Sequence, residues 1–152
     1  MTWSRIAAAF NYHGALLDIY VLETSHQDWA RVWDLLRAKP ERLTFEIDGQ
    51  AKPPPAEVAE VFNFYPARSV LVSYRLGKQR LNCHFFTEEE IEFDLDPRDV
   101  DSLLEADRLV GFLNALGRAT MKEVLLTVEN SPDEVIARYD PTSDTLEWSV
   151  GY

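Results

Sequence analysis

Residues 90–116, EIEFDLDPRDVDSLLEADRLVGFLNAL, combine two hydrophobic periodicities in one continuous stretch. From Ile91 to Leu95 apolar residues alternate with acidic ones, which is the two-residue period of a β-strand with one buried face. From Val100 to Leu116 the apolar residues recur every three or four positions, as in a helix that packs on a core. A strand followed directly by an amphipathic helix indicates a domain in which helices cover a sheet.

The same stretch carries signals for where its helix begins and ends. Asp96 can act as the N-cap, Pro97 suits the first helical position, and Gly117 suits the position just past the helix end. The pattern allows a break near Ala106. The residues expected to face the core are Val100, Leu103, Leu104, Leu109, Val110, Leu113 and Leu116.

Outward from this stretch, alternating apolar and polar residues predict strands on both sides. These strands are expected at residues 6–10, 15–22, 43–47, 69–76, 80–86, 123–128, 135–139 and 145–150. Turn-forming residues at 11–14, 77–79 and 140–144 would join successive strands as hairpins.

Two further helices are expected. Ser25 and Asp28 form a variant of the capping box and start a helix that ends before Pro40. The apolar face of this helix consists of Trp29, Val32, Trp33 and Leu36. A short helix at 56–62 would follow Pro55, which pre-sets the backbone of a first turn.

These elements define the expected fold. Because most connections between strands have the length of hairpins, the sequence predicts a largely antiparallel sheet with two to three helices packed on one face. The fold class is therefore α+β, a two-layer single domain spanning residues 1–152. Residues on the apolar side of their elements should be buried, in particular Trp33, Leu36, Val72, Phe93 and Leu113.

Negative charge is concentrated in residues 88–107. This window contains ten acidic residues and one base, Arg98, and so holds −9 of the net charge of −11. Such a field repels nucleic acid and acidic membranes, and it attracts basic proteins or divalent cations. We therefore expect a basic protein partner. The residues expected to form the partner-binding face are Glu88, Glu89, Glu90, Glu92, Asp94, Asp96, Asp99 and Asp101.

The sequence lacks the common catalytic and cofactor motifs. Its six glycines are scattered, so there is no phosphate-binding loop and no dinucleotide fingerprint. Cys83, the single cysteine, lies on the apolar side of its strand and is expected to be an inert core thiol, whereas His84 should face outward. No catalytic residue and no cofactor is predicted. The absence of a signal peptide and of a long apolar segment favours the cytoplasm.

Metal binding is the main alternative for the acidic residues. Carboxylates are the ligands that Ca²⁺ and Mg²⁺ prefer, and a metal-assisted hydrolase could use Glu92, Asp94, Asp96 and Asp99 if at least three of them converged. However, the run lacks a central glycine, contains the rigid Pro97, and places its strand carboxylates side by side, so no metal site is predicted. A solvated surface that only keeps the protein soluble and a regulatory subunit of another complex are further alternatives.

A small acidic α+β domain with one cysteine and no catalytic motif resembles the immunity proteins of bacterial polymorphic-toxin and effector systems. The resemblance rests on the acidic run 88–101, the absence of a signal peptide and the segment ENSPDEVIARYDPTSDTLEW at 129–148. This class has no shared motif, so no site residue is carried over from it. The resemblance implies that the chain binds a cognate toxin and occludes a basic active-site cleft, with carboxylates in place of phosphates.

Overall fold

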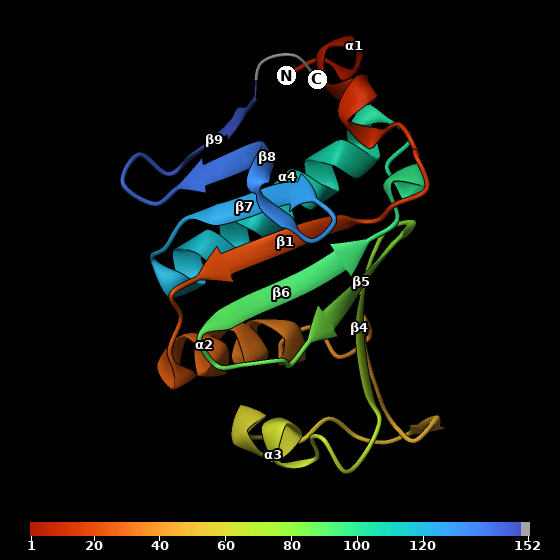
Figure 1. Ribbon diagram of the computed structural model, residues 1–152, viewed down its shortest axis with the longest axis vertical. Helices are drawn as coiled ribbons and strands as arrows, with labels where there is room; N and C mark the ends of the chain where they lie inside the picture. The colour runs from red at the N-terminus through yellow and green to blue at the C-terminus, as the bar shows by residue number, and fades with distance from the viewer. Residues whose placement is uncertain (150–152) are drawn as a thin grey trace.

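The computed structural model describes residues 1–149, which form nine strands and four α-helices (Figure 1). The strands are β1 (Leu17–Leu22), β2 (Leu43–Ile47), β3 (Gln50–Ala51), β4 (Val70–Leu76), β5 (Gln79–His84), β6 (Glu90–Leu95), β7 (Val124–Val128), β8 (Ser131–Asp140) and β9 (Thr145–Trp148). The helices are α1 (Trp3–Ile6), α2 (His26–Arg37), α3 (Val58–Asn63) and α4 (Leu103–Thr120), with 3₁₀ turns η1 (Ala7–Phe10) and η2 (Pro97–Asp99).

All nine strands belong to one sheet with the order β3-β2-β4-β5-β6-β1-β7-β8-β9. Every pair of neighbours is antiparallel, which confirms the predicted α+β class and the antiparallel sheet. β1 lies in the interior of the sheet, between β6 and β7, although it comes first in the chain. Its first five residues are all buried, so both faces of this strand are covered.

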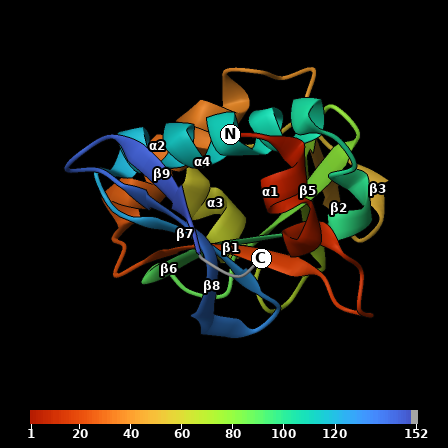
Figure 2. The same ribbon diagram turned by 90° about the horizontal axis from the view of Figure 1, so that it is seen from above.

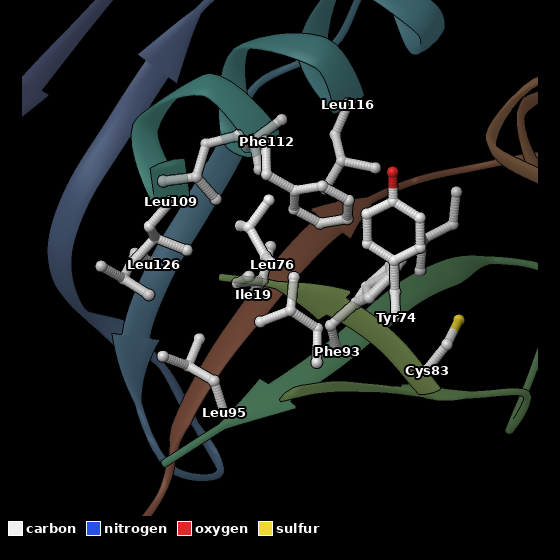
Figure 3. Close-up of a cluster of buried hydrophobic side chains, with 14 of the residues drawn as sticks. Ile19, Tyr74, Leu76, Cys83, Phe93, Leu95, Leu109, Phe112, Leu116 and Leu126 are labelled. Carbon is white, nitrogen blue, oxygen red and sulfur yellow. The ribbon is translucent and has the colours of Figure 1, made fainter. Parts of the chain in front are cut away.

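The two faces of the sheet differ in chemistry. The inner face is the one that carries Phe93, and the outer face is the one that carries Asp94. Phe112 of α4 contacts Phe93 edge-on at 5.3 Å between ring centroids, and Trp33 of α2 contacts Phe85 at 5.9 Å. α2 and α4 therefore lie side by side over the inner face (Figure 2), where the close-up of the core shows Phe112 beside Tyr74 and Phe93 (Figure 3).

The residues that hydrophobic periodicity predicts to be buried lie in the core. Trp33, Leu36, Val72, Phe93 and Leu113 are at most 1% exposed. The predicted register of β6 is therefore confirmed. Ser25 and Asp28 form both hydrogen bonds of the capping box at the start of α2, as predicted.

The N-terminal segment corrects one prediction. Residues 6–10, expected to be a strand, belong to the helical turns α1 and η1. The run Ala7-Ala8-Ala9 has no β-branched residue, and alanine is the strongest helix former. The segment packs its aromatic residues against the last strand instead, because Phe10 contacts Trp148 at 5.9 Å and Trp3 at 6.2 Å between ring centroids.

The bounds of α4 correct a second prediction. Ser102 caps this helix, whereas Asp96 caps only the 3₁₀ turn η2. Leu103 and Leu104 consequently lie in the exposed first turn, with 36% and 60% of their surface accessible, and not on the buried stripe. The helix has no break near Ala106, and it continues past Gly117 to a left-handed residue, Met121 (φ 57°).

Gly117 has a packing role inside α4 and does not end the helix. A Cβ atom built on Gly117 would overlap the ring of Tyr139 on β8. The glycine thus permits close contact between the helix and the sheet. α3 also starts later than predicted, at Val58, and the carbonyl of Pro55 instead accepts a hydrogen bond from Trp33 Nε1 at 2.8 Å. The predicted strand 145–150 ends at Trp148, and position 150 lies outside the described residues.

Candidate functional site

The structure distributes the eight predicted partner-binding residues along the full length of β6. Glu88 and Glu89 form the turn before the strand, Glu90, Glu92 and Asp94 lie on it, and Asp96, Asp99 and Asp101 follow it. A strand of six residues spans about 20 Å. The acidic window therefore extends from the turn before β6 to the segment after it, and its two ends lie far apart.

The group that follows β6 is largely neutralised by the protein's own bases. Arg98 donates two hydrogen bonds to Asp96 Oδ2, at 2.7 and 3.2 Å, and Lys78 contacts Asp101 at 2.8 Å. Hydrogen bonds from Arg98 lower the pKa of Asp96, and a hydrogen bond from Lys78 lowers that of Asp101. Burial, with repulsion from Asp96, raises the pKa of Asp99. This end of the window stabilises the entry to α4 and offers little free charge to a partner.

The group that precedes β6 is more open. Glu88 and Glu89 are exposed, and the backbone of this turn is fixed by Thr24, whose hydroxyl donates to Glu88 O at 2.7 Å and whose N–H donates to Glu89 O at 3.0 Å. Glu88 contacts His26 at 3.4 Å. Within residues 1–149, Glu89, Glu90 and Glu92 form no ion pair with a base.

An exposed aromatic side chain adjoins these carboxylates. Phe86 is 70% exposed, and its ring stacks on the imidazole of His84 with the centroids 5.1 Å apart and the planes at 2°. His84 lies opposite Glu92 in the antiparallel register of β5 and β6. We call Phe86, Glu88, Glu89, Glu90 and Glu92 the Phe86 patch.

Behind the patch, a hydrogen-bonded network crosses the outer face of the sheet. Asp94 accepts from Asn82 Nδ2 at 3.0 Å and lies 2.5 Å from His84 Nε2. Asn82 Oδ1 in turn accepts from Ser73 at 3.1 Å. The hydrogen bond to Asp94 raises the pKa of His84. His84 thus faces outward, as predicted, and is half-buried and held by a carboxylate.

Asp18 is the second carboxylate of this network. It lies directly opposite Asp94 in the register of β1 and β6 and is 3% exposed. Its Oδ2 accepts hydrogen bonds from Tyr20 Oη at 3.0 Å and from Asn130 N at 2.7 Å. Burial raises the pKa of Asp18 despite the hydrogen bond from Asn130, and the charge of Asp94 acts in the same direction. Two acidic side chains therefore adjoin in the central strands of the sheet.

Glu92 lies at the edge of the network and is affected by the same burial and by the same neighbouring charges. It lies opposite Tyr20, which is 4% exposed. Burial raises the pKa of Glu92, and the charge of Asp18 adds to this effect. Glu92 consequently belongs both to the network and to the patch. Replacing Glu92 with Gln should not disturb the fold, since burial and the charge of Asp18 both disfavour the charged carboxylate in the folded state.

The arrangement does not fit the metal-assisted hydrolase. Asp96 is held by Arg98 and Asp99 lies in η2, so these two do not join Glu92 and Asp94 around a common point. Throughout residues 1–149, no group of three or more His, Cys, Asp or Glu side chains is placed to hold a metal ion. Cys83 is buried on the inner face, where burial raises the pKa of its thiol, in agreement with the predicted core position.

Asp18, Asn82 and Phe86 are not among the residues predicted for the site. A signal for Asp18 exists in the segment ALLDIYVL, where one acid interrupts an otherwise apolar strand. Such a residue must find hydrogen bonds if both faces of the strand are covered. A signal for Phe86 is its alternation with Asn82 and His84, which assigns it to the polar face.

Two further findings complete the description of the molecule. None of the helices in residues 1–149 has the length and apolar character needed to cross a membrane. Comparison with protein-family models, curated proteins and solved structures finds no match to this chain.

Proposed function

We propose that this chain is an immunity-type inhibitor, which binds a basic protein, a cognate toxin, through the Phe86 patch and occludes the active-site cleft of that toxin. The observation that carries the proposal is the position of Phe86, which is 70% exposed and lies beside Glu89, Glu90 and Glu92, none of which forms an ion pair in residues 1–149. Protein interfaces typically place aromatic anchors at their centre and polar residues around them.

The rigidity of the patch supports the proposal. Phe86 is held by its stack on His84, and the turn at Glu88 and Glu89 is held by the hydrogen bonds from Thr24. A surface that is ordered before binding loses less conformational entropy when the complex forms. The carboxylates would steer a basic partner toward the patch, which increases the association rate.

The test is co-expression of this chain with the product of the neighbouring gene. The proposal predicts that the two proteins co-purify and that the chain restores growth of cells in which the neighbouring product is toxic. Replacing Phe86 with Ala should weaken binding by about 2 kcal/mol or more, roughly thirtyfold in Kd, if Phe86 is a central anchor. Because Phe86 is exposed, the free energy of unfolding should change by less than about 0.5 kcal/mol.

The matched control uses exposed acids elsewhere. The variant E89Q/E90Q/E92Q removes three charges from the patch. The variant E41Q/E57Q/E60Q removes three charges from α3, from its N-cap and from the segment between α2 and β2. Only the first should impair co-purification and protection. If the wild-type chain neither binds nor protects, the proposed function is wrong. If it binds and both triple variants bind equally well, the partner uses another surface.

A further inference from the structure

A cavity of about 380 Å³ lies on the inner side of the sheet, away from the Phe86 patch. It opens where the C-terminal end of α2 and the middle of α4 approach the C-terminal end of β4. Its apolar walls are formed by Leu35, Leu76 and Phe112, and Tyr74 stands beside Phe112 with the ring centroids 5.4 Å apart (Figure 3). A cavity of this size falls within the range of sites for small organic molecules.

The cavity contains a polar group that the described chain leaves without a partner. Tyr74 is only 5% exposed and lines the cavity, and its hydroxyl forms no hydrogen bond with any residue from 1 to 149. Figure 3 shows this hydroxyl pointing away from the sheet, at the level of the helix layer. The hydroxyl is not sealed from solvent. It is therefore available to form a hydrogen bond with a polar group of a ligand in the cavity.

The rim of the cavity is positively charged, in contrast to the rest of the protein. Three of its eleven lining residues are bases, Lys39, Arg42 and Arg108, and none is an acid, although the chain has 26 acids and only 15 bases. Arg108 is paired with Glu105 at 2.5 Å. Lys39 and Arg42 form no ion pair with a carboxylate in the described part of the chain.

The α4 wall of the cavity has an unexplained glycine. Gly111 lies in the helix interior, where glycine is less favourable than alanine. A Cβ atom at this position would meet nothing within 4 Å, so packing within the chain does not require a glycine there. Gly111 does, however, line the cavity, together with Ala115 of the same helix. The small residues leave room for a bound molecule to approach the helix backbone.

We propose that this cavity binds a small carboxylate with an apolar body. The carboxylate lies at the rim, where Lys39 and Arg42 donate charge-assisted hydrogen bonds, and the body packs on Phe112 and Leu76. The Tyr74 hydroxyl donates to the ligand. The inference is independent of the proposed function, since the cavity and the Phe86 patch lie on opposite faces of the sheet.

The test is calorimetric titration of the purified chain with octanoate and, in parallel, with octanol, which has a similar body but no charge. Octanoate should bind saturably and more tightly than octanol. The variant K39Q/R42Q should bind octanoate about tenfold more weakly or worse, because charge-assisted hydrogen bonds are lost. The control K52Q/R138Q removes the same charge at other exposed positions and should bind octanoate as the wild type does.

A second variant tests the position of the site. Replacing Gly111 with Leu fills the cavity and should abolish octanoate binding while the near-ultraviolet circular dichroism remains native. Absence of saturable octanoate binding to the wild type would overturn the proposal. Equal affinity for octanol and octanoate, or unchanged affinity of K39Q/R42Q, would also overturn it. The comparison of wild type with K39Q/R42Q remains informative even if the Gly111 variant fails to fold. The side chains of Lys39 and Arg42 are exposed, so their replacement should not disturb the fold.

Discussion

Asp18 and Asp94 are an unusual pair of residues for the centre of a sheet. They lie opposite each other on neighbouring strands, where like charges are destabilising. Hydrogen bonds compensate in part, since Asp18 accepts from Tyr20 and Asn130, while Asp94 accepts from Asn82 and contacts His84. A positive charge on His84 would offset the remaining repulsion. The network therefore couples the protonation of these side chains to the stability of the sheet.

Replacing Asp18 with Asn tests the repulsion directly. The amide oxygen can still accept from Asn130 and Tyr20, and the new NH₂ group can donate to Asp94. Because the native pKa of Asp18 is raised above 3.8, its ionisation lowers stability as the pH rises through that raised value. We therefore expect D18N to increase the free energy of unfolding at pH 7, and the gain should shrink in acid. Urea denaturation at several pH values measures it, and a loss of stability at pH 7 would contradict this account.

His84 should make stability depend on pH in a defined direction. Its native pKa is raised above the ordinary 6.5 by the hydrogen bond to Asp94, so the folded state holds the proton more tightly. The stabilisation is complete below pH 6.5 and is lost as the pH rises through the raised pKa. In H84Q the side-chain amide can still donate to Asp94 but cannot titrate. The difference in free energy of unfolding between wild type and H84Q should therefore be largest below pH 6.5.

The control for this experiment is His13, which is exposed and forms no ion pair with any residue from 1 to 149. H13Q should leave the pH profile of stability unchanged. A wild-type profile that H84Q reproduces at every pH would show that the His84–Asp94 pair does not contribute.

At the level of elements, α4 contains two glycines with opposite expected effects. Gly117 lies against the ring of Tyr139, whose hydroxyl donates to Asp144 at 2.6 Å and so holds the ring in place. G117A should destabilise the protein by about 1–3 kcal/mol, as overpacked sites do. G111A should instead stabilise it by up to about 1 kcal/mol, because the helix gains propensity and the new methyl group meets no atom within 4 Å. Urea denaturation measures the change in the free energy of unfolding for each variant. Equal changes would contradict the tight contact at Gly117 and the open space at Gly111.

The same helix shows how far periodicity predicts an element. Leu109, Leu113 and Leu116 of the predicted stripe are buried, because burial and the helical period coincide there, whereas Val110 is only partly buried. The N-terminus of α4 is predicted too early in the chain, because Asp96 and Ser102 are both good N-cap residues and local sequence does not rank them. The end is misplaced because the role of Gly117 is a contact with β8, and a contact between distant segments leaves no local signal.

At the level of the molecule, the two faces of the sheet carry different kinds of side chain. Its inner face carries the core and the cavity beside α4, and its outer face carries the carboxylate network and, at one end, the Phe86 patch. The amount of negative charge was readable from the sequence. Arg98 neutralises Asp96 from two residues away, but the contact of Lys78 with Asp101 comes from the turn between β4 and β5 and is not determined by local patterns.

The central claim is that the partner binds the Phe86 patch and not the whole acidic window. The association rate constant of the partner, the product of the neighbouring gene, tests it most directly when measured by stopped flow at low and at physiological salt. Exposed charges are screened over about 8 Å at physiological ionic strength, so the wild-type rate should fall with salt.

For E89Q/E90Q/E92Q the rate should be lower at low salt and should depend less on salt. Neutralising the other end of β6 with D96N/D99N/D101N should leave the rate close to that of the wild type. A larger loss of rate in D96N/D99N/D101N than in E89Q/E90Q/E92Q would contradict the assignment of the binding surface.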